Sequence, residues 1–262
     1  MNIVFIGDVV GKPGRRILAR MLPALRREVG ADLAIANGEN SAGGFGITPE
    51  TLDDLLAAGV DVVTGGNHTW QAREIYTLLD SHPRILRPAN YPPGTPGRGS
   101  GVFRSSGPTP GAVAVLNLEG RVFMQPLESP FEVGRDEAER LRQEASVIIV
   151  DMHAEATSEK IALGWYLDGR VSAVIGTHTH VQTADERILP EGTAFISDAG
   201  MTGPRDSVIG MGRDEVLQRF LTLLPARFDV AAGPAQLNAV VVEVDDQTGR
   251  ARRIQRVSRT EG

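Results

Sequence analysis

The sequence predicts an α/β fold, because short apolar runs alternate with segments of helical periodicity and because each of five such runs stops at a polar cluster. The runs are rich in Val and Ile and cover residues 3–6, 33–36, 60–63, 147–150 and 171–175. The carboxyl ends of strands in this kind of fold meet at one edge of the sheet, where ligands bind. Five separate segments are therefore expected to bring their side chains to one place.

The segments between these strands carry helix signals. Residues 14–28 hold Ile and Leu side chains at helical spacing, although Pro23 is expected to kink that helix. The pair Thr48-Pro49 is typical of a helix cap followed by a first-turn proline, so a second helix is expected to begin there and to end near Gly59. A third helix is expected over residues 155–167.

The middle and end of the chain differ from this pattern. Residues 87–101 are too rich in Pro and Gly for regular structure, so they predict a long connector, either a lid or an oligomer contact. Alternating runs at 112–118, 239–244 and 251–257 predict antiparallel strands added to a partly parallel sheet. No repeat or boundary interrupts the chain, so residues 1–262 are expected to form a single domain.

Composition excludes several classes of protein. A net charge of -6 argues against a broad basic surface for polymeric nucleic acid. The absence of cysteine excludes disulfides, thiolate zinc sites and a cysteine nucleophile. The first residues, MNIVFIGDVVG, lack the features of a secretory signal, and no stretch approaches the roughly 20 apolar residues that span a bilayer. We expect a soluble, cytoplasmic protein that binds no membrane.

The polar clusters at the strand ends are the main functional signal. In chain order they are Gly7-Asp8, Glu39-Asn40, Asn67-His68, Asp151-Met152-His153 and His178-Thr179-His180. Oxygen and imidazole ligands without thiolates suit Mn, Fe or Zn, and so many candidates could hold two ions. Two ions about 3.5 to 4 Å apart activate water and neutralise phosphoryl oxygens, which indicates phosphoester hydrolysis.

Some of these residues also have structural interpretations. Asp8 could equally well cap a helix that begins near Pro13. Glu39 is a poor turn residue, which favours a ligand. Asp151 is expected to hydrogen-bond nearby backbone rather than to bind metal, and a lone His153 would more often be structural.

The remaining candidates differ in strength. His178 and His180 are the strongest pair, because two imidazoles one residue apart at a strand end rarely have a packing reason. His82 lies outside every cluster and is expected at the surface. Trp70 is expected in the core rather than stacked on a base. The glycine-rich loop 43–46 could let backbone approach a phosphate or could be only a turn.

The ordered set GDVVG, NGEN, GGNH, DMH and GTHTH resembles the calcineurin-like dinuclear metallophosphoesterases, and within them the YmdB-type subfamily of 2',3'-cyclic-nucleotide 2'-phosphodiesterases. The resemblance covers essentially the whole chain. It implies a four-layer α/β/β/α sandwich with two mixed β-sheets. It also implies hydrolysis of 2',3'-cyclic nucleotides to 3'-nucleotides by attack of a metal-bridging hydroxide.

The same resemblance implies two metal ions per chain, Fe or Mn, with Zn as the alternative. Glu39 would bridge them, with Asp8, Asn40 and His180 on one ion and Asn67, His153 and His178 on the other. Val10 stands where the superfamily has a histidine, and Asn40 would take over that coordination position. His68 would be the general acid that protonates the leaving 2'-oxygen, although Thr69 follows it where many relatives have an acidic residue.

Other functions remain as alternatives. A phosphomonoesterase or nucleotidase would use the same dinuclear site, and a regulatory, RNA-associated protein would carry it with only incidental activity. An amidohydrolase barrel is disfavoured because its His-x-His pair usually comes early in the chain and because eight strand-helix units are not seen. The expected partners are a small nucleotide phosphodiester and further copies of the chain in a homo-oligomer, with no need for polymeric nucleic acid.

Overall fold

Each of the five apolar runs forms a strand in the computed structural model, which describes residues 1–261. These strands are β1 (Asn2–Ile6), β3 (Leu33–Asn37), β4 (Val62–Thr64), β7 (Val147–His153) and β8 (Ala173–Thr177). Every residue of the last four is buried, as expected for strands that are covered on both faces. β7 continues through the polar cluster, so Asp151 and His153 project from the strand itself.

The first sheet has seven strands in the order β2-β11-β12-β1-β3-β4, with β13 also paired to β12. The strands not yet introduced are β2 (Asp8–Val9), β11 (Met201–Pro204), β12 (Ala235–Val244) and β13 (Ala251–Thr260). β1, β3 and β4 run parallel, whereas β12 runs antiparallel to β1, β11 and β13. The two late antiparallel strands predicted from the sequence are therefore confirmed.

The second sheet has six strands in the order β5-β6-β7-β8-β10-β9. The additional strands are β5 (Ser100–Arg104), β6 (Ala112–Glu119), β9 (Arg187–Ile188) and β10 (Ala194–Ile196). β6, β7, β8 and β10 are parallel, and β5 and β9 add antiparallel edges. The sequence predicts an antiparallel strand at residues 112–118. This is correct for the pairing of β6 with β5 and wrong for its pairing with β7, which is parallel.

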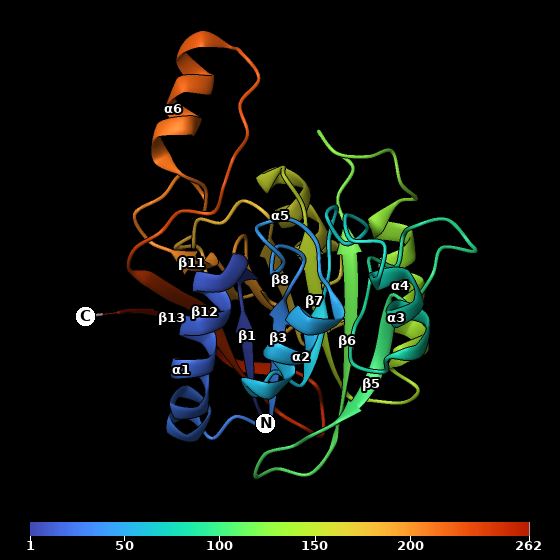
Figure 1. Ribbon diagram of the computed structural model, residues 1–262. Coiled ribbons are helices and arrows are strands. Elements are labelled where there is room, and N and C mark those ends of the chain that lie inside the picture. The colour runs from blue at the N-terminus through green and yellow to red at the C-terminus, as the bar shows by residue number, and fades with distance from the viewer. Residues whose placement is uncertain (262) are drawn as a thin grey trace.

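The helices form outer layers around the two sheets (Figure 1). α1 (Gly11–Val29), α2 (Pro49–Ala57) and α3 (Ile75–Ser81) pack on the first sheet, and α4 (Pro130–Leu141) and α5 (Thr157–Tyr166) pack on the second. Between the sheets lies a core to which both contribute, including Phe5 from one and Ile149 from the other. This arrangement confirms the expected α/β/β/α sandwich.

Local sequence signals explain several boundaries. Thr48 caps α2 in a capping box with Thr51, as the sequence predicts. α1 begins three residues earlier than expected and continues through Pro23. The predicted connector is irregular up to β5, which includes the last two residues of the 87–101 range. None of the described helices has the length and apolar character needed to cross a bilayer.

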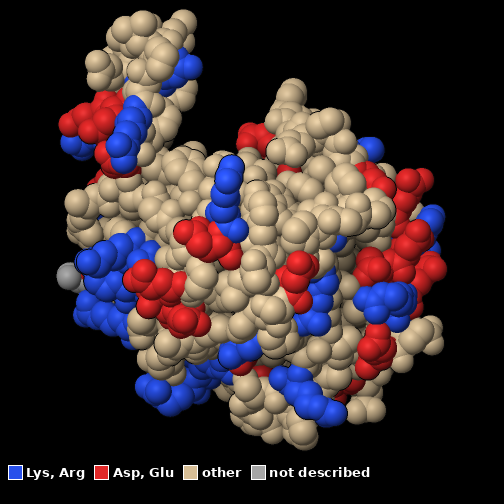
Figure 2. Space-filling view, turned by 45° about the vertical axis from the view of Figure 1, so that its right-hand side comes forward, with Lys and Arg blue, Asp and Glu red and all other residues tan. Residues whose placement is uncertain are grey.

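One helix stands apart from this body. α6 (Arg213–Thr222) projects as an arm, and Figure 2 shows that the arm is separated from the rest of the surface. Phe220 and Leu221 on the arm are 74% and 83% exposed. The two chain segments at the root of the arm are joined by hydrogen bonds from Gly212 N to Asp229 O and from Ala231 N to Gly210 O, each 2.9 Å. The arm is thus anchored at its root.

Candidate metal centre

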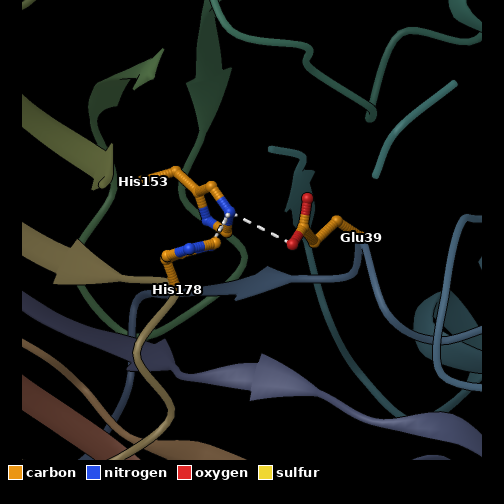
Figure 3. Close-up of side chains that lie close together, drawn as sticks. All are labelled: Glu39, His153 and His178. Atoms are coloured by element: carbon orange, nitrogen blue, oxygen red, sulfur yellow. Dashed lines mark hydrogen bonds and ion pairs between the residues drawn. The ribbon is translucent and has the colours of Figure 1, made fainter. Parts of the chain in front are cut away.

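Three side chains from different segments converge where the strands end (Figure 3). Glu39 follows β3, His153 ends β7 and His178 follows β8. One ligand atom from each lies within 4.8 Å of the others. The topology explains this convergence, because β7 and β8 are parallel neighbours and the two sheets pack face to face.

His153 is the centre of a first group of ligand atoms. Its Nε2 lies 3.1 Å from Glu39 Oε1, 2.9 Å from Asn67 Oδ1 and 3.0 Å from His178 Nδ1. These four residues come from four different strand ends. Carboxylate, amide oxygen and two imidazoles within such distances can coordinate one cation.

A second group lies beside the first. Asp8 Oδ1 is 3.8 Å from His180 Nε2, and Asn40 Nδ2 is 3.2 Å from the same nitrogen. Asn40 Nδ2 is also 3.3 Å from Glu39 Oε1, so Glu39 contacts members of both groups. All seven residues that the sequence singles out as ligands therefore belong to one continuous cluster.

The cap interpretation of Asp8 is wrong. α1 begins at Gly11, and its N-cap residue, Val10, makes no side-chain cap hydrogen bond. Asp8 instead lies buried in β2, where its Oδ2 accepts a hydrogen bond of 3.2 Å from the backbone N–H of His178.

Two oxygens of the cluster have no hydrogen-bond partner among the described residues. They are Asp8 Oδ1 and the side-chain oxygen of Asn40, and both are buried. Leaving a buried acceptor unpaired costs about 1–3 kcal/mol, and more for a charged group. Oxygens in this situation are suited to a cation, so the donor set fits a metal site on chemical grounds.

Mutual electrostatics shift the pKa values in the cluster. Burial alone would raise the pKa of Glu39, but the adjacent His153 lowers it to about 2. Burial would lower the pKa of His153, but Glu39 and Asp8 raise it to about 10. Burial and the charge of His153 lower the pKa of His178 to about 3. A cation that binds here must displace the proton of His153, so its affinity increases with pH.

A hydrogen-bonded chain behind His153 orients its ring. Thr177 Oγ1 donates to Asp151 Oδ1 at 2.7 Å and lies 2.9 Å from His153 Nδ1. Because the hydroxyl proton goes to the carboxylate, Nδ1 carries the proton that is donated to Thr177. Nε2 then presents its lone pair to the cluster, which is the usual arrangement for a metal-ligating histidine.

Asp151 has partners that the sequence did not predict. It was expected to bond nearby backbone, but its Oδ2 accepts from Thr64 Oγ1 at 2.5 Å and from Asn37 Nδ2 at 3.1 Å. All three residues are buried. The only signal for this support was that polar residues interrupt otherwise apolar strand ends.

His180 is oriented in a similar way. Its Nδ1 donates to the carbonyl oxygen of Ile209 at 2.8 Å, which leaves Nε2 toward Asp8 and Asn40. Both His178 and His180 have positive φ, 94° and 67°. Such backbone costs about 1–3 kcal/mol per residue and is typical of functional sites.

His68 lies at the edge of the cluster. Its backbone N–H donates to Glu39 Oε2 at 2.8 Å, and its ring makes a T-shaped contact with the ring of Phe45, with centroids 4.9 Å apart. Its Nδ1 is buried without a partner among the described residues, and burial lowers its pKa. Thr69 makes no side-chain bond to this ring; its hydroxyl accepts from Gly66 N at 2.9 Å and closes the turn.

Two other residues singled out from the sequence lie outside the cluster. Trp70 packs against the core and against Tyr91, with ring centroids 5.5 Å apart, which supports the core interpretation. His82 is partly exposed, and its Nδ1 accepts from Arg84 N at 3.2 Å.

One buried carboxylate near the cluster was missed. Glu119 is paired with His153 in the register of β6 and β7, so both side chains point to the same face of the sheet. Both of its carboxylate oxygens lack a partner among the described residues, and burial raises its pKa to about 7.

Comparison with known proteins shows which family the chain resembles. The family model described as YmdB-like protein matches residues 4–257. A 2',3'-cyclic-nucleotide 2'-phosphodiesterase from Bacillus subtilis (strain 168) is 49% identical over 257 residues, which are 98% of this chain and 96% of the relative.

Solved structures agree with this match. A hypothetical protein from Thermus thermophilus superposes with a TM-score of 0.93 and 44% identity, covering 100% of both chains. A structure described as a novel phosphatase from Mycoplasma pneumoniae gives a TM-score of 0.92 and 36% identity, covering 99% of this chain and 93% of the other.

Proposed function

Because the chain belongs to the YmdB-like protein family, we propose that it is a metal-dependent phosphodiesterase that hydrolyses 2',3'-cyclic nucleotides to 3'-nucleotides. The observation that carries the proposal is the convergence of seven oxygen and nitrogen ligands from both sheets at one edge. The Bacillus subtilis relative, a 2',3'-cyclic-nucleotide 2'-phosphodiesterase that is 49% identical to this chain, supports the same substrate class.

The ligand set proposed from the sequence agrees with this geometry. Asp8, Glu39, Asn40 and His180 would hold one ion, and Glu39, Asn67, His153 and His178 would hold the other. Fe or Mn suits this mixture of oxygen and imidazole, with Zn as the alternative. Two bound ions would supply Lewis acidity toward the phosphoryl oxygens and activate a water molecule.

The side chains of the protein supply the remaining chemistry. His68 donates a proton to the 2'-oxygen as it leaves. Its backbone is fixed by Glu39, and its ring is packed against Phe45 from the glycine-rich loop. A pKa below the usual range makes the protonated ring a stronger acid toward the leaving group.

The test combines product identification, metal analysis and one substitution. We expect 2',3'-cyclic AMP to be hydrolysed to 3'-AMP faster than 3'-AMP or an aryl phosphodiester is cleaved. His68→Ala should lower kcat by about 10²- to 10⁴-fold with unchanged metal content, whereas the remote His82→Ala should leave kcat unchanged. Loss of metal from His68→Ala, or a kcat equal to that of wild type, would contradict the role of His68.

A phosphomonoesterase is the second candidate, because the Mycoplasma pneumoniae relative is described as a phosphatase. It would use the same ligands and would show a marked preference for 3'-AMP over the cyclic substrate. A third candidate, a regulatory RNA-associated protein, predicts that cells carrying folded, metal-loaded His68→Ala keep full function. A single domain, a cytoplasmic location and a homo-oligomer remain predictions from the sequence.

A further inference from the structure

The turn that carries His178 and His180 needs support from its surroundings. Both residues adopt positive φ, which favours glycine and is unfavourable for an imidazole side chain. A conformation of this kind persists only when neighbouring groups hold it in place. Besides the bonds of His178 to Asp8 and of His180 to Ile209, the turn is held through Thr179, which lies between the two histidines.

Asp198 holds Thr179 by two hydrogen bonds. Its Oδ2 accepts from the backbone N–H of Thr179 at 3.0 Å and from the Thr179 hydroxyl at 2.6 Å. Its Oδ1 accepts from the backbone N–H of Gly200 at 2.7 Å. Both oxygens of the carboxylate are therefore occupied, and its orientation is fixed.

Lys160 supplies the charge that allows this carboxylate to be buried. Its Nζ lies 2.9 Å from Asp198 Oδ2 and 3.4 Å from Thr179 Oγ1. The side chains of Lys160 and Asp198 are each 1% exposed, and an unpaired charge in such a place would be strongly unfavourable.

The path of the lysine is also specific. Lys160 reaches from α5 past Gly176, where an added Cβ would approach its Cδ to 3.0 Å and overlap the backbone oxygen of Ser197. Lys12 and Lys160 are the only lysines among 27 cationic residues. An ammonium is compact, whereas a guanidinium is a wide planar fork, so this narrow path accounts for a lysine here in a chain whose other cationic residues are nearly all arginine.

We propose that Lys160 is a positioning residue for the metal centre, which acts through Asp198 and Thr179 to hold His178 and His180 in their ligating conformation. The inference rests on the proposed metal site. Among the described contacts, neither Lys160 nor Asp198 forms a hydrogen bond with a proposed ligand, so the effect passes through the turn.

The experiment measures metal affinity separately from stability. Wild-type protein and Lys160→Met are freed of metal with a chelator, checked by circular dichroism and titrated with Mn²⁺ in a calorimeter. We expect Mn²⁺ to bind 10- to 100-fold more weakly to the variant, the range found when groups behind metal ligands are removed. Affinity within twofold of wild type would overturn the proposal.

A matched control separates positioning from general loss of an ion pair. Arg26 forms a partly buried pair with Asp61 at 2.7 Å on the outer side of the first sheet. Arg26→Met should lower the melting temperature and leave Mn²⁺ affinity unchanged. An equal loss of affinity in this control would show that Lys160→Met acts only through stability, which would also overturn the proposal.

A double variant covers the case in which Lys160→Met does not fold because Asp198 is left unpaired. Lys160→Met combined with Asp198→Asn removes both charges and keeps similar side-chain volumes. We expect it to fold and still to bind Mn²⁺ at least 10-fold more weakly, because the amide cannot accept from both Thr179 and Gly200. Wild-type affinity in the double variant would overturn the proposal.

The same titration separates this inference from the proposed function. Wild-type protein that binds no Mn²⁺, Fe²⁺ or Zn²⁺ would overturn both. Wild-type binding and hydrolysis of 2',3'-cyclic AMP, with unchanged affinity in the Lys160 variants, would overturn this inference alone.

Discussion

At the scale of single residues, Glu39 is held by contacts at both of its carboxylate oxygens. One oxygen lies near His153 and Asn40, and the other accepts the backbone N–H of His68. The carboxylate thus touches both proposed metal groups and the segment that carries the proposed acid. Its loss should have wider effects than the loss of any neighbour.

This difference can be measured by substitution. Glu39→Ala should abolish the binding of both metals, whereas Asn40→Ala should weaken chiefly the metal held with Asp8 and His180. Metal content per chain is measured by mass spectrometry after dialysis. From about two ions in wild type it should fall to about zero in Glu39→Ala and to about one in Asn40→Ala. Equal losses in both variants would show that Glu39 is not shared.

Glu119 predicts a pH dependence of stability. Its folded-state pKa, about 7, lies above the usual value of 4.5, so its contribution is complete below 4.5 and is lost as pH rises through 7. At 1.36 kcal/mol per pKa unit this amounts to roughly 3 kcal/mol. Glu119→Gln removes the titration, so chelator-treated variant protein should lose less stability than chelator-treated wild type between pH 5 and pH 8.

Denaturant unfolding at both pH values provides the measurement. The comparison of the two proteins cancels the titration of groups that do not interact with Glu119. The same pH dependence in wild type and in Glu119→Gln would contradict the raised pKa.

At the scale of elements, the turn after β4 begins at Gly66, where the packing leaves no room for a side chain. A Cβ added at Gly66 would overlap Glu39 Oε2 and the ring of His153. The turn is closed by Thr69, whose N–H donates to Gly66 O and whose hydroxyl accepts Gly66 N–H. Asn67 and His68 therefore project from a short, rigid segment.

Gly66→Ala should therefore damage the metal site more than the fold. We expect at least a 10-fold loss of Mn²⁺ affinity, because Glu39 and His153 must move apart. Gly94→Ala is the matched control, because Gly94 has φ +87° with no atom near its Cβ position. This substitution should lower the stability by about 1 kcal/mol and leave the metal affinity unchanged. Unchanged metal affinity in Gly66→Ala would contradict the packing argument.

The elements show how far sequence alone can lead. Strand ends were predictable because apolar runs stop abruptly at Asp8, Glu39 or His178, and the α2 boundary was predictable because Thr48 caps locally. The support behind the ligands was not predictable. Thr64 and Asp151 are 87 positions apart, and their side chains meet only because the two sheets pack face to face.

At the scale of the whole molecule, the proposed ligands are divided between the two sheets. Asp8, Glu39, Asn40 and Asn67 lie on or after strands of the first sheet, and His153, His178 and His180 on or after strands of the second. Bound metal would therefore connect the two halves of the sandwich.

Metal removal should consequently lower the stability of the entire fold. At a free metal concentration 100 times the Kd, binding contributes about 2.7 kcal/mol. Calorimetry of chelator-treated and metal-loaded protein should show a higher melting temperature with metal, in a single transition. An unchanged melting temperature would show that the cluster holds no metal in the folded protein.

The exposed arm α6 has a consequence for limited proteolysis. Phe220 and Leu221 are accessible to a protease that cleaves after large apolar residues, whereas both chain segments at the root are hydrogen-bonded to each other. Ile209, whose carbonyl orients His180, precedes these root hydrogen bonds in the chain and so lies outside the arm. A cut in the arm should therefore yield two fragments that stay associated, retain metal and separate only in denaturant.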